Sequence, residues 1–327
     1  MAHNVETMAY AGAVPWHGLG VKVDSNLTPE QMLKAAQLDW TVQKRQLWVN
    51  MGEGGNDDVL LNTHSALVRD VDEKVLGICG KDYNPTQNSE SFGFFDRFCR
   101  AGDMTMETAG SLQEGRRVWA LAKIKGGFRV NGGDEVDGYI LLDSPHIWGK
   151  SLQIMFTPIR VVCNNTLTMA LNSADINATF RMTHDQLFTA EIKKQAEEKV
   201  GLATAALDRF KDQSKFLASK SYTDQSLMRF FTQIMNPSAE LAANEELNPA
   251  ELGRTVNRLI ELVDTQPGAD MKTSKGTWWG AFNAVTYYYD HVAGVDRDKS
   301  LTSAWFGSAA NRKRNALGLA VEYAEAA

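Results

Sequence analysis

A cysteine followed by two amide side chains, Cys163-Asn164-Asn165, comes after one expected strand and before one expected helix. A helix N-terminus lowers the pKa of a nearby thiol, so Cys163 could act as a nucleophile there. A nucleophile also needs a base, and His146 and His184 are the candidates. The same residues equally fit a structural role, with a small buried thiol and Asn165 capping the helix.

A second irregular segment runs from Pro15 to Gly20 and contains Trp16 and His17. Both rings have a flat face and a polar tip, which suits the edge of a binding cleft. A cleft formed with Asn164 and Asn165 would favour an enzyme. The alternative is a flap in which Trp16 plugs a sheet.

Carboxylates at Asp134, Glu135 and Asp137 are candidates for a metal-dependent nuclease, which needs two or three of them around one ion. The familiar metal and nucleotide motifs are absent, however. The sequence has no P-loop, no pair of cysteines with two residues between them and no zinc-protease helix motif. We therefore expect no metal and no cofactor.

Basic residues gather on one expected hairpin, and a further arginine follows on a later strand. Strand alternation places Val118, Ala120 and Ala122 on one face and the cations on the other. Such a face suits either a phosphate backbone or simply solvent. The predicted phosphate-binding residues here are Arg116, Arg117, Lys123, Lys125 and Arg160, with Arg129 beside them.

Near the C-terminus, the cluster Arg312, Lys313 and Arg314 follows a region rich in aromatic residues. Aromatic rings can stack on bases while basic side chains hold phosphates. The helical spacing of Trp279 and Phe282 is instead typical of a core. We therefore expect the basic cluster to be the exposed part.

These residues need a framework, which the pattern predicts as α+β. The first half shows closely spaced strands with short turns, so most of its sheet should be antiparallel, with flanking helices. Apolar residues then recur every three or four positions from Ile192 to Leu217, which predicts a long heptad-like helix. The expected domains are residues 1–175, an antiparallel α+β domain, and residues 176–327, a helical domain.

Composition narrows the class of protein. The 327 residues are 43% hydrophobic and 23% charged, with a net charge of −6, so a uniformly basic nucleic-acid binder is excluded. Three cysteines fit a reducing compartment. No apolar stretch is long enough for a membrane span, and we expect a cytoplasmic protein with no membrane contact.

Several strings together resemble one family. The strings are Pro15–Gly20, Tyr83–Asn88, Gly115–Ala120, Thr157–Leu167 and Thr277–Thr286. They resemble the phage/plasmid-like proteins of the domain of unknown function 932. This resemblance implies a mobile element and a bacterial cytoplasm, and it carries no catalytic residue with it.

The leading functional hypothesis is a non-catalytic protein that binds or anneals single-stranded DNA during phage, prophage or plasmid replication and recombination. A β-rich half with basic residues, followed by long helices, is similar in outline to ring-forming annealing proteins. Homo-oligomers would multiply weak contacts to the strand. Two alternatives stay open. One is an enzyme centred on Cys163 or on carboxylates and a metal, and the other is a protein-interaction factor that modulates host processes.

Overall fold

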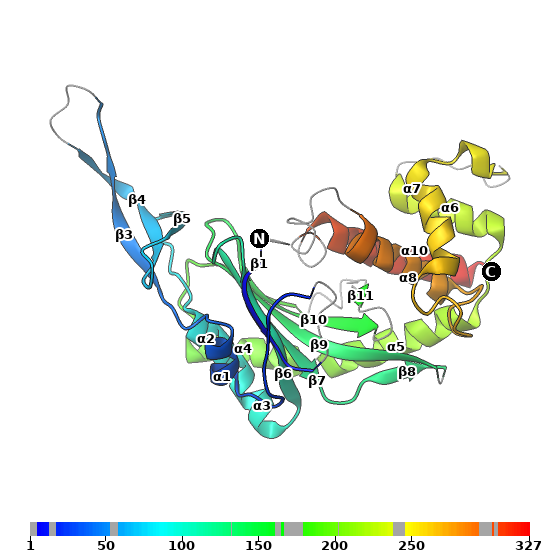
Figure 1. Ribbon diagram of the computed structural model, residues 1–327, viewed down its shortest axis with the longest axis horizontal. Coiled ribbons are helices and arrows are strands. Elements are labelled where there is room, and N and C mark those ends of the chain that lie inside the picture. Colours follow the sequence, from blue (N-terminus) through cyan, green and yellow to red (C-terminus); the bar gives the residue numbers. More distant parts are fainter. Residues whose placement is uncertain are drawn as a thin grey trace. The chain divides into compact units, whose positions relative to one another are not determined.

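The fold mixes strands and helices as expected. We analysed a computed structural model of the chain (Figure 1). Strands dominate its N-terminal half and helices its C-terminal half, and the sheets are mainly antiparallel, which confirms the α+β class. The structure describes residues 5–12, 18–52, 58–131, 133–160, 165–166, 179–201, 203–237, 246–293, 303 and 307–327.

Nine strands of the described chain form the main sheet, with β11-β10-β9-β7-β6-β1-β2 as the order of the central path. β8 and β12 pair with β9 and β10 at the side. All the pairs with a defined register are antiparallel except that of β1 with β2. The strands are β1 Val5–Tyr10, β2 Val21–Lys22, β6 Met104–Leu112, β7 Arg117–Ile124, β8 Phe128–Val130, β9 Asp134–Pro145, β10 Leu152–Arg160, β11 Asn165–Thr166 and β12 Thr179–Met182.

Strand β7 lies in the middle of this sheet, between β6 and β9. Side chains on both of its faces are buried, and Trp119 and Ala120 are fully covered although they point to opposite faces. The expectation of one solvated, basic face along this strand is therefore wrong. When both faces of a central strand are covered, its sequence is a nearly continuous run of apolar residues.

A second sheet contains three strands among the described residues, in the order β3-β4-β5. They are β3 Val42–Val49, β4 Val59–Arg69 and β5 Val75–Gly80, and both pairings are antiparallel. β5 pairs with residues 64–68 of β4 only, so β3 and β4 continue past it as a two-stranded ribbon.

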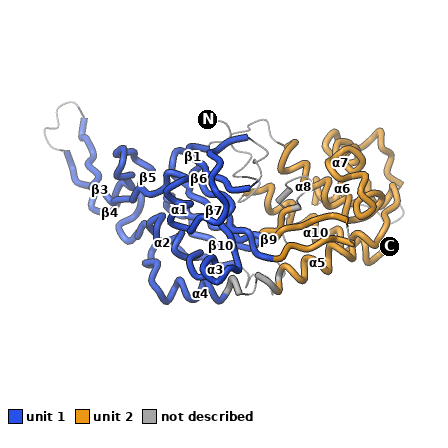
Figure 2. Tube along the Cα trace, turned by 60° about the horizontal axis from the view of Figure 1, so that its bottom comes forward, with its two compact units in different colours: residues 1–125, 139–156, 177–202 blue, residues 126–138, 157–176, 203–327 orange. Residues whose placement is uncertain are grey.

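Contacts divide the chain into two compact units (Figure 2). Unit 1 comprises residues 1–125, 139–156 and 177–202, and unit 2 comprises residues 126–138, 157–176 and 203–327. Each unit is built from separated stretches of sequence because strands β9 and β10 are each divided between the two. The expected boundary at residues 175 and 176 falls outside the described residues and stays a prediction.

Helix α1 of unit 1 begins with a clear capping signal. Thr28 accepts from the backbone of Gln31, whose side chain bonds back, and Pro29 occupies the first turn. This confirms the helix start expected at Thr28. The helices are α1 Pro29–Ala35, α2 Asn88–Phe92, the 3-10 helix η2 Gly93–Phe95, α3 Asp96–Ala101 and α4 Ala190–Gly201.

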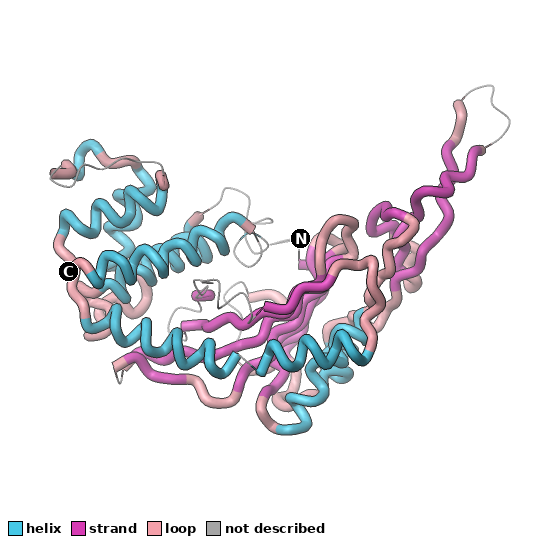
Figure 3. Tube along the Cα trace, turned by 180° about the vertical axis from the view of Figure 1, so that it is seen from behind, coloured by secondary structure: helices cyan, strands magenta, loops and turns pink. Residues whose placement is uncertain are grey.

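Unit 2 is largely helical, as the cyan tubes of Figure 3 show. Its core contains Trp278, Trp279, Phe230 and Phe282, all fully buried. The heptad-like stripe falls on two helices, α4 and α5, and the stripe residue Phe210 is fully buried. The helices are α5 Ala203–Ser219, α6 Asp224–Met235, η4 Pro249–Glu251, α7 Arg254–Thr265, α8 Trp278–Tyr287, the π-helix η5 Tyr288–Val292 and α10 Ser308–Glu325.

Candidate nucleic-acid interface

Two of the predicted basic residues, Arg312 and Arg314, line one hollow in unit 2. It has a volume of about 680 Å³ and lies against α6 and α10. Most of its lining side chains carry hydrogen-bonding groups. The lining residues are Gln233, Ile234, Pro237, Ser308, Asn311, Arg312, Arg314, Asn315, Gly318, Leu319 and Glu322.

Helix α10 presents the two arginines because they flank its buried stripe. Lys313 and Leu317 are fully covered. At about 100° per residue, the neighbours of a buried position lie on the two flanks of a helix. Arg312 and Arg314 are accordingly half-buried. The sequence cluster Arg312, Lys313 and Arg314 thus becomes two partly accessible guanidinium groups with one buried cation between them.

Each guanidinium group donates to a neutral oxygen atom. Arg312 donates to the backbone carbonyl of Ile234 at the end of α6, at 3.4 Å, and Arg314 donates to Oδ1 of Asn311 at 2.9 Å. Arg312 also lowers the pKa of Tyr289, although burial raises it more and the net shift is upward.

The chemistry of this hollow suits an anion with several acceptor oxygens. Arginine matches phosphate in a two-pronged geometry, and the amides of Asn311 and Asn315 add neutral donors. The carboxylate of Glu322 lines the same hollow and opposes an anion there. Two cations against one carboxylate leave a net positive lining.

The prediction that Lys313 is exposed at the surface is wrong. Its ammonium is fully buried and donates to Oδ1 of Asp290 at 2.5 Å. Burial lowers the pKa of Lys313, and the Asp290 carboxylate opposes that shift. A lysine held in this way is a structural ion pair and does not reach a phosphate backbone.

The prediction that Arg117 belongs to an accessible basic face is also wrong. It donates from Nε and one terminal nitrogen to the two carboxylate oxygens of Asp143, each at 2.6 Å, and both residues are buried. Burial raises the pKa of Asp143, and Arg117 counters this shift. Asp143 lies on the neighbouring antiparallel strand β9, opposite Trp119 of β7. Its carboxylate compensates the charge of Arg117, which is why an arginine can be buried within the sheet.

The other predicted cations of unit 1 do not form one cluster. Arg116 is exposed before β7 begins, whereas Lys125 is exposed and Lys123 half-buried at the far end of the strand. At about 3.3 Å per residue, the two ends of β7 lie roughly 23 Å apart. In unit 2, Arg129 on β8 is exposed, and Arg160 is the last residue of β10, with its side chain outside the described part.

The predicted cleft and nucleophile lie mostly outside the described residues. These are Trp16, His17, Cys163 and Asn164. The backbone of Asn165 is described, and it pairs in β11 with Arg160 of β10, so the expectation that Asn165 caps a helix is wrong. Whether Cys163 is reactive, and whether these residues share a cleft, stays a prediction.

The candidate carboxylates of unit 2 are engaged in different ways. Asp134 is fully buried and accepts from the indole nitrogen of Trp279 at 2.8 Å. Asp137 is also buried, beside Gly127, whereas Glu135 is exposed. Within the described residues, no group of three or more His, Cys, Asp or Glu side chains is placed to hold a metal ion.

Unit 1 brings together two histidines that the sequence offered only as separate candidates. His146 is fully buried, donates to Oδ1 of Asn88 at 3.0 Å and packs edge-on against Trp40. Burial lowers the pKa of His146 to about 3, with the charge of His184 as a smaller cause. His184 stacks on Tyr83, at 4.7 Å between ring centres, and burial lowers its pKa too. These rings form a buried polar cluster within unit 1.

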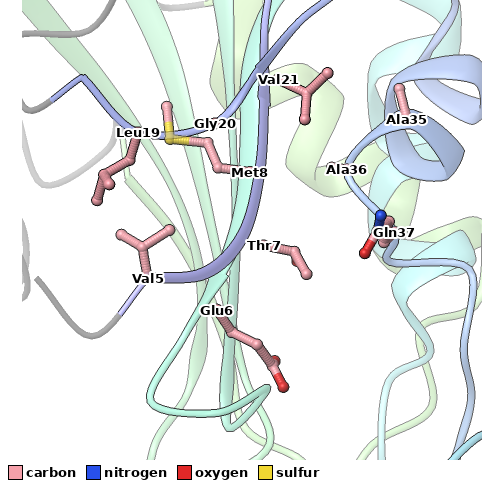
Figure 4. A pocket seen from close by; sticks show the side chains of 10 residues that line it. All are labelled: Val5, Glu6, Thr7, Met8, Leu19, Gly20, Val21, Ala35, Ala36 and Gln37. Atoms are coloured by element: carbon pink, nitrogen blue, oxygen red, sulfur yellow. The ribbon is translucent and has the colours of Figure 1, made fainter. Parts of the chain in front are cut away.

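A further hollow of about 440 Å³ lies beside β1 in unit 1 (Figure 4). Its lining is mainly aliphatic and includes Val5, Met8 and Val21. Glu6 also lines it, but Arg69 already binds both oxygens of that carboxylate, at 2.8 and 2.9 Å. We therefore assign no polar ligand to this hollow. No signal in the sequence pointed to it.

Comparison with known families adds one result. The family described as Domain of unknown function (DUF932) matches residues 75–316. This match covers most of the sequence, so the chain belongs to that family. No curated protein and no solved structure matches the chain. Among the described residues, no helix is both long and apolar enough to cross a membrane.

Proposed function

We propose that this protein binds single-stranded DNA without catalysis, and that it anneals or protects strands in the cytoplasm of a bacterium carrying a phage, prophage or plasmid. The observation that carries the proposal is the α6–α10 hollow, where Arg312 and Arg314 lie beside amide donors. Exposed Arg129 on β8 adds a cation to the same unit. Homo-oligomers of the chain are part of the proposal.

Electrostatics favour a local contact of this kind. With a net charge of −6, the protein as a whole repels nucleic acid, so attraction must come from a confined positive region. Guanidinium groups contacting phosphates release counterions, and binding then weakens with salt. Repeating a few such contacts in an oligomer raises the total affinity without a strongly basic subunit.

The test is fluorescence anisotropy of a labelled single-stranded oligonucleotide, titrated with protein at several salt concentrations. We expect stronger binding to the single strand than to the matching duplex, with a linear log–log dependence on salt. Replacing both Arg312→Gln and Arg314→Gln should reduce the salt slope by about 1.4 for two lost phosphate contacts. A strand-annealing assay on the same variant should show slower annealing.

A matched control removes two cations away from the hollow. Arg254→Gln together with Lys272→Gln changes the net charge equally, at exposed positions of unit 2. This control should retain the wild-type slope. Loss of binding to the same degree in both variants would show a general charge effect and would refute the assignment to the hollow. Absence of binding by folded wild-type protein at low salt would refute the proposed function.

A further inference from the structure

The ribbon formed by β3 and β4 exposes apolar side chains. Among the described residues beyond β5, only β3 and β4 continue, as Figure 1 shows. Trp48 pairs with Leu60 there, followed by Val49 with Val59. Trp48 is 57% exposed, and Val49, Met51, Val59 and Leu61 are exposed as well. A two-stranded ribbon is only marginally stable in water, and exposed apolar patches generally mark contact surfaces.

One edge of this ribbon is open to further pairing. No strand of the described chain pairs with β3 on the side away from β4. The Gln87 amide blocks this edge at its first residue only, accepting from the backbone nitrogen of Val42 at 2.9 Å and donating to its carbonyl at 3.0 Å. Because backbone groups alternate along a strand, the N–H groups of Lys44 and Gln46 point to the same open side. Such an edge is a template for a strand from another chain.

We propose that the open edge of β3 pairs antiparallel with β3 of a second copy of this chain, about a two-fold axis at Gln46. In that register Lys44 lies opposite Trp48 and Arg45 opposite Leu47 of the other copy. Each basic residue then lies opposite an apolar or aromatic residue, so no like charges meet directly across the pair. The ammonium of Lys44 stays on its own copy, where it donates to the backbone carbonyls of Lys81 and Tyr83. One neighbouring symmetric register, centred on Arg45, would instead place two arginines directly opposite each other.

The sequence of β3 therefore favours β3 of a second copy, in antiparallel orientation, as the strand that pairs with the open edge. Its basic residues lie toward the base of the ribbon and its apolar residues toward the tip, so inversion brings unlike ends together. Pairing would cover the open backbone edge and place Trp48 and Val49 beside side chains of the other ribbon in a continuous sheet. A two-fold interface of this kind uses the same patch on both copies. This inference names the contact surface for the oligomer included in the proposed function.

The test is disulfide cross-linking of the full chain under mild oxidation, read on a non-reducing gel. At a hydrogen-bonded antiparallel pair the two Cα atoms lie about 5.5 Å apart, within reach of a disulfide. Gln46→Cys should therefore give a covalent dimer. Gln43→Cys is the matched control, since it is exposed on the same strand. In the register centred on Gln46, the two Gln43 positions would lie six residues out of register, roughly 20 Å apart.

Sedimentation velocity of unmodified protein supplies the second measurement. We expect a reversible dimer that Trp48→Ser weakens at least tenfold. The proposal is overturned if Gln46→Cys gives no dimer, if Gln43→Cys cross-links equally well, or if the wild type sediments as a monomer. It is also overturned if Trp48→Ser weakens DNA binding but leaves the sedimentation unchanged, which would assign the ribbon to nucleic acid. Because cross-linking and sedimentation are measured without DNA, a negative result in them is distinguishable from failure of DNA binding.

Discussion

Protonation of His146 should destabilise the protein in mild acid. The ring is fully buried, and its Nε2–H donates to Asn88 Oδ1. The amide nitrogen of Asn88 donates to the carbonyls of Leu38, at 2.9 Å, and Trp40, at 3.4 Å. This arrangement fixes the amide orientation. No hydrogen-bond partner for Nδ1 of His146 occurs in the described structure, so nothing there stabilises a second proton.

The sign and size of the effect follow from the pKa. Burial lowers the pKa of His146 from 6.5 to about 3 in the folded chain. The unfolded chain therefore binds the proton more tightly, and stability falls as the pH drops below the unfolded value. Each pH unit is worth about 1.4 kcal/mol, so His146 alone removes about 2 kcal/mol at pH 5. His184, with a pKa lowered by the same cause, acts in the same direction.

The assay is urea denaturation followed by circular dichroism at pH 7.5 and at pH 5. His146→Gln cannot take up the proton, and its amide nitrogen can still donate to Asn88. We expect this variant to lose about 2 kcal/mol less between the two pH values than the wild type does. An equal loss in His146→Gln and wild type would refute the reasoning.

Three further predictions concern unit 2. Lys313→Met leaves the Asp290 carboxylate buried without its cation, and we expect a loss of about 3–5 kcal/mol in the free energy of unfolding. Adding Asp290→Leu should restore most of it, and urea denaturation measures both; no recovery would contradict an ion-pair origin. A Cβ at Gly280 would lie 2.0 Å from the carbonyl oxygen of Ser274, so Gly280→Ala should prevent stable folding. Gly318 on α10 has open space, and Gly318→Ala should stabilise by about 0.5–1 kcal/mol in thermal unfolding; destabilisation there would contradict this.

Local signals explain why the fold class could be predicted from the sequence. Thr28 with Gln31 and Pro29 defines a helix start through contacts within four residues. The α5 stripe is equally local, since a period of three to four residues places Phe210 and Leu217 on one buried face. The family resemblance rested on short strings of residues and was confirmed over residues 75–316.

The candidate site was predicted only in part. The sequence grouped Arg312, Lys313 and Arg314 as three equivalent cations, and the structure separates them by their position around α10. Which of the three residues is buried depends on the face of α10 that packs against the rest of the unit. Sequence spacing shows that neighbours differ in direction, but it does not show which one turns inward.

The sequence by itself determined the α+β class, the helix starts and the membership of the family, because each depends on residues close together in the chain. Tertiary structure decided which charges are available. Arg117 meets Asp143 across two strands, and Lys313 meets Asp290 from another helix. An ion pair between residues far apart in sequence leaves no local pattern, and removal from water then turns an expected surface cation into part of the core.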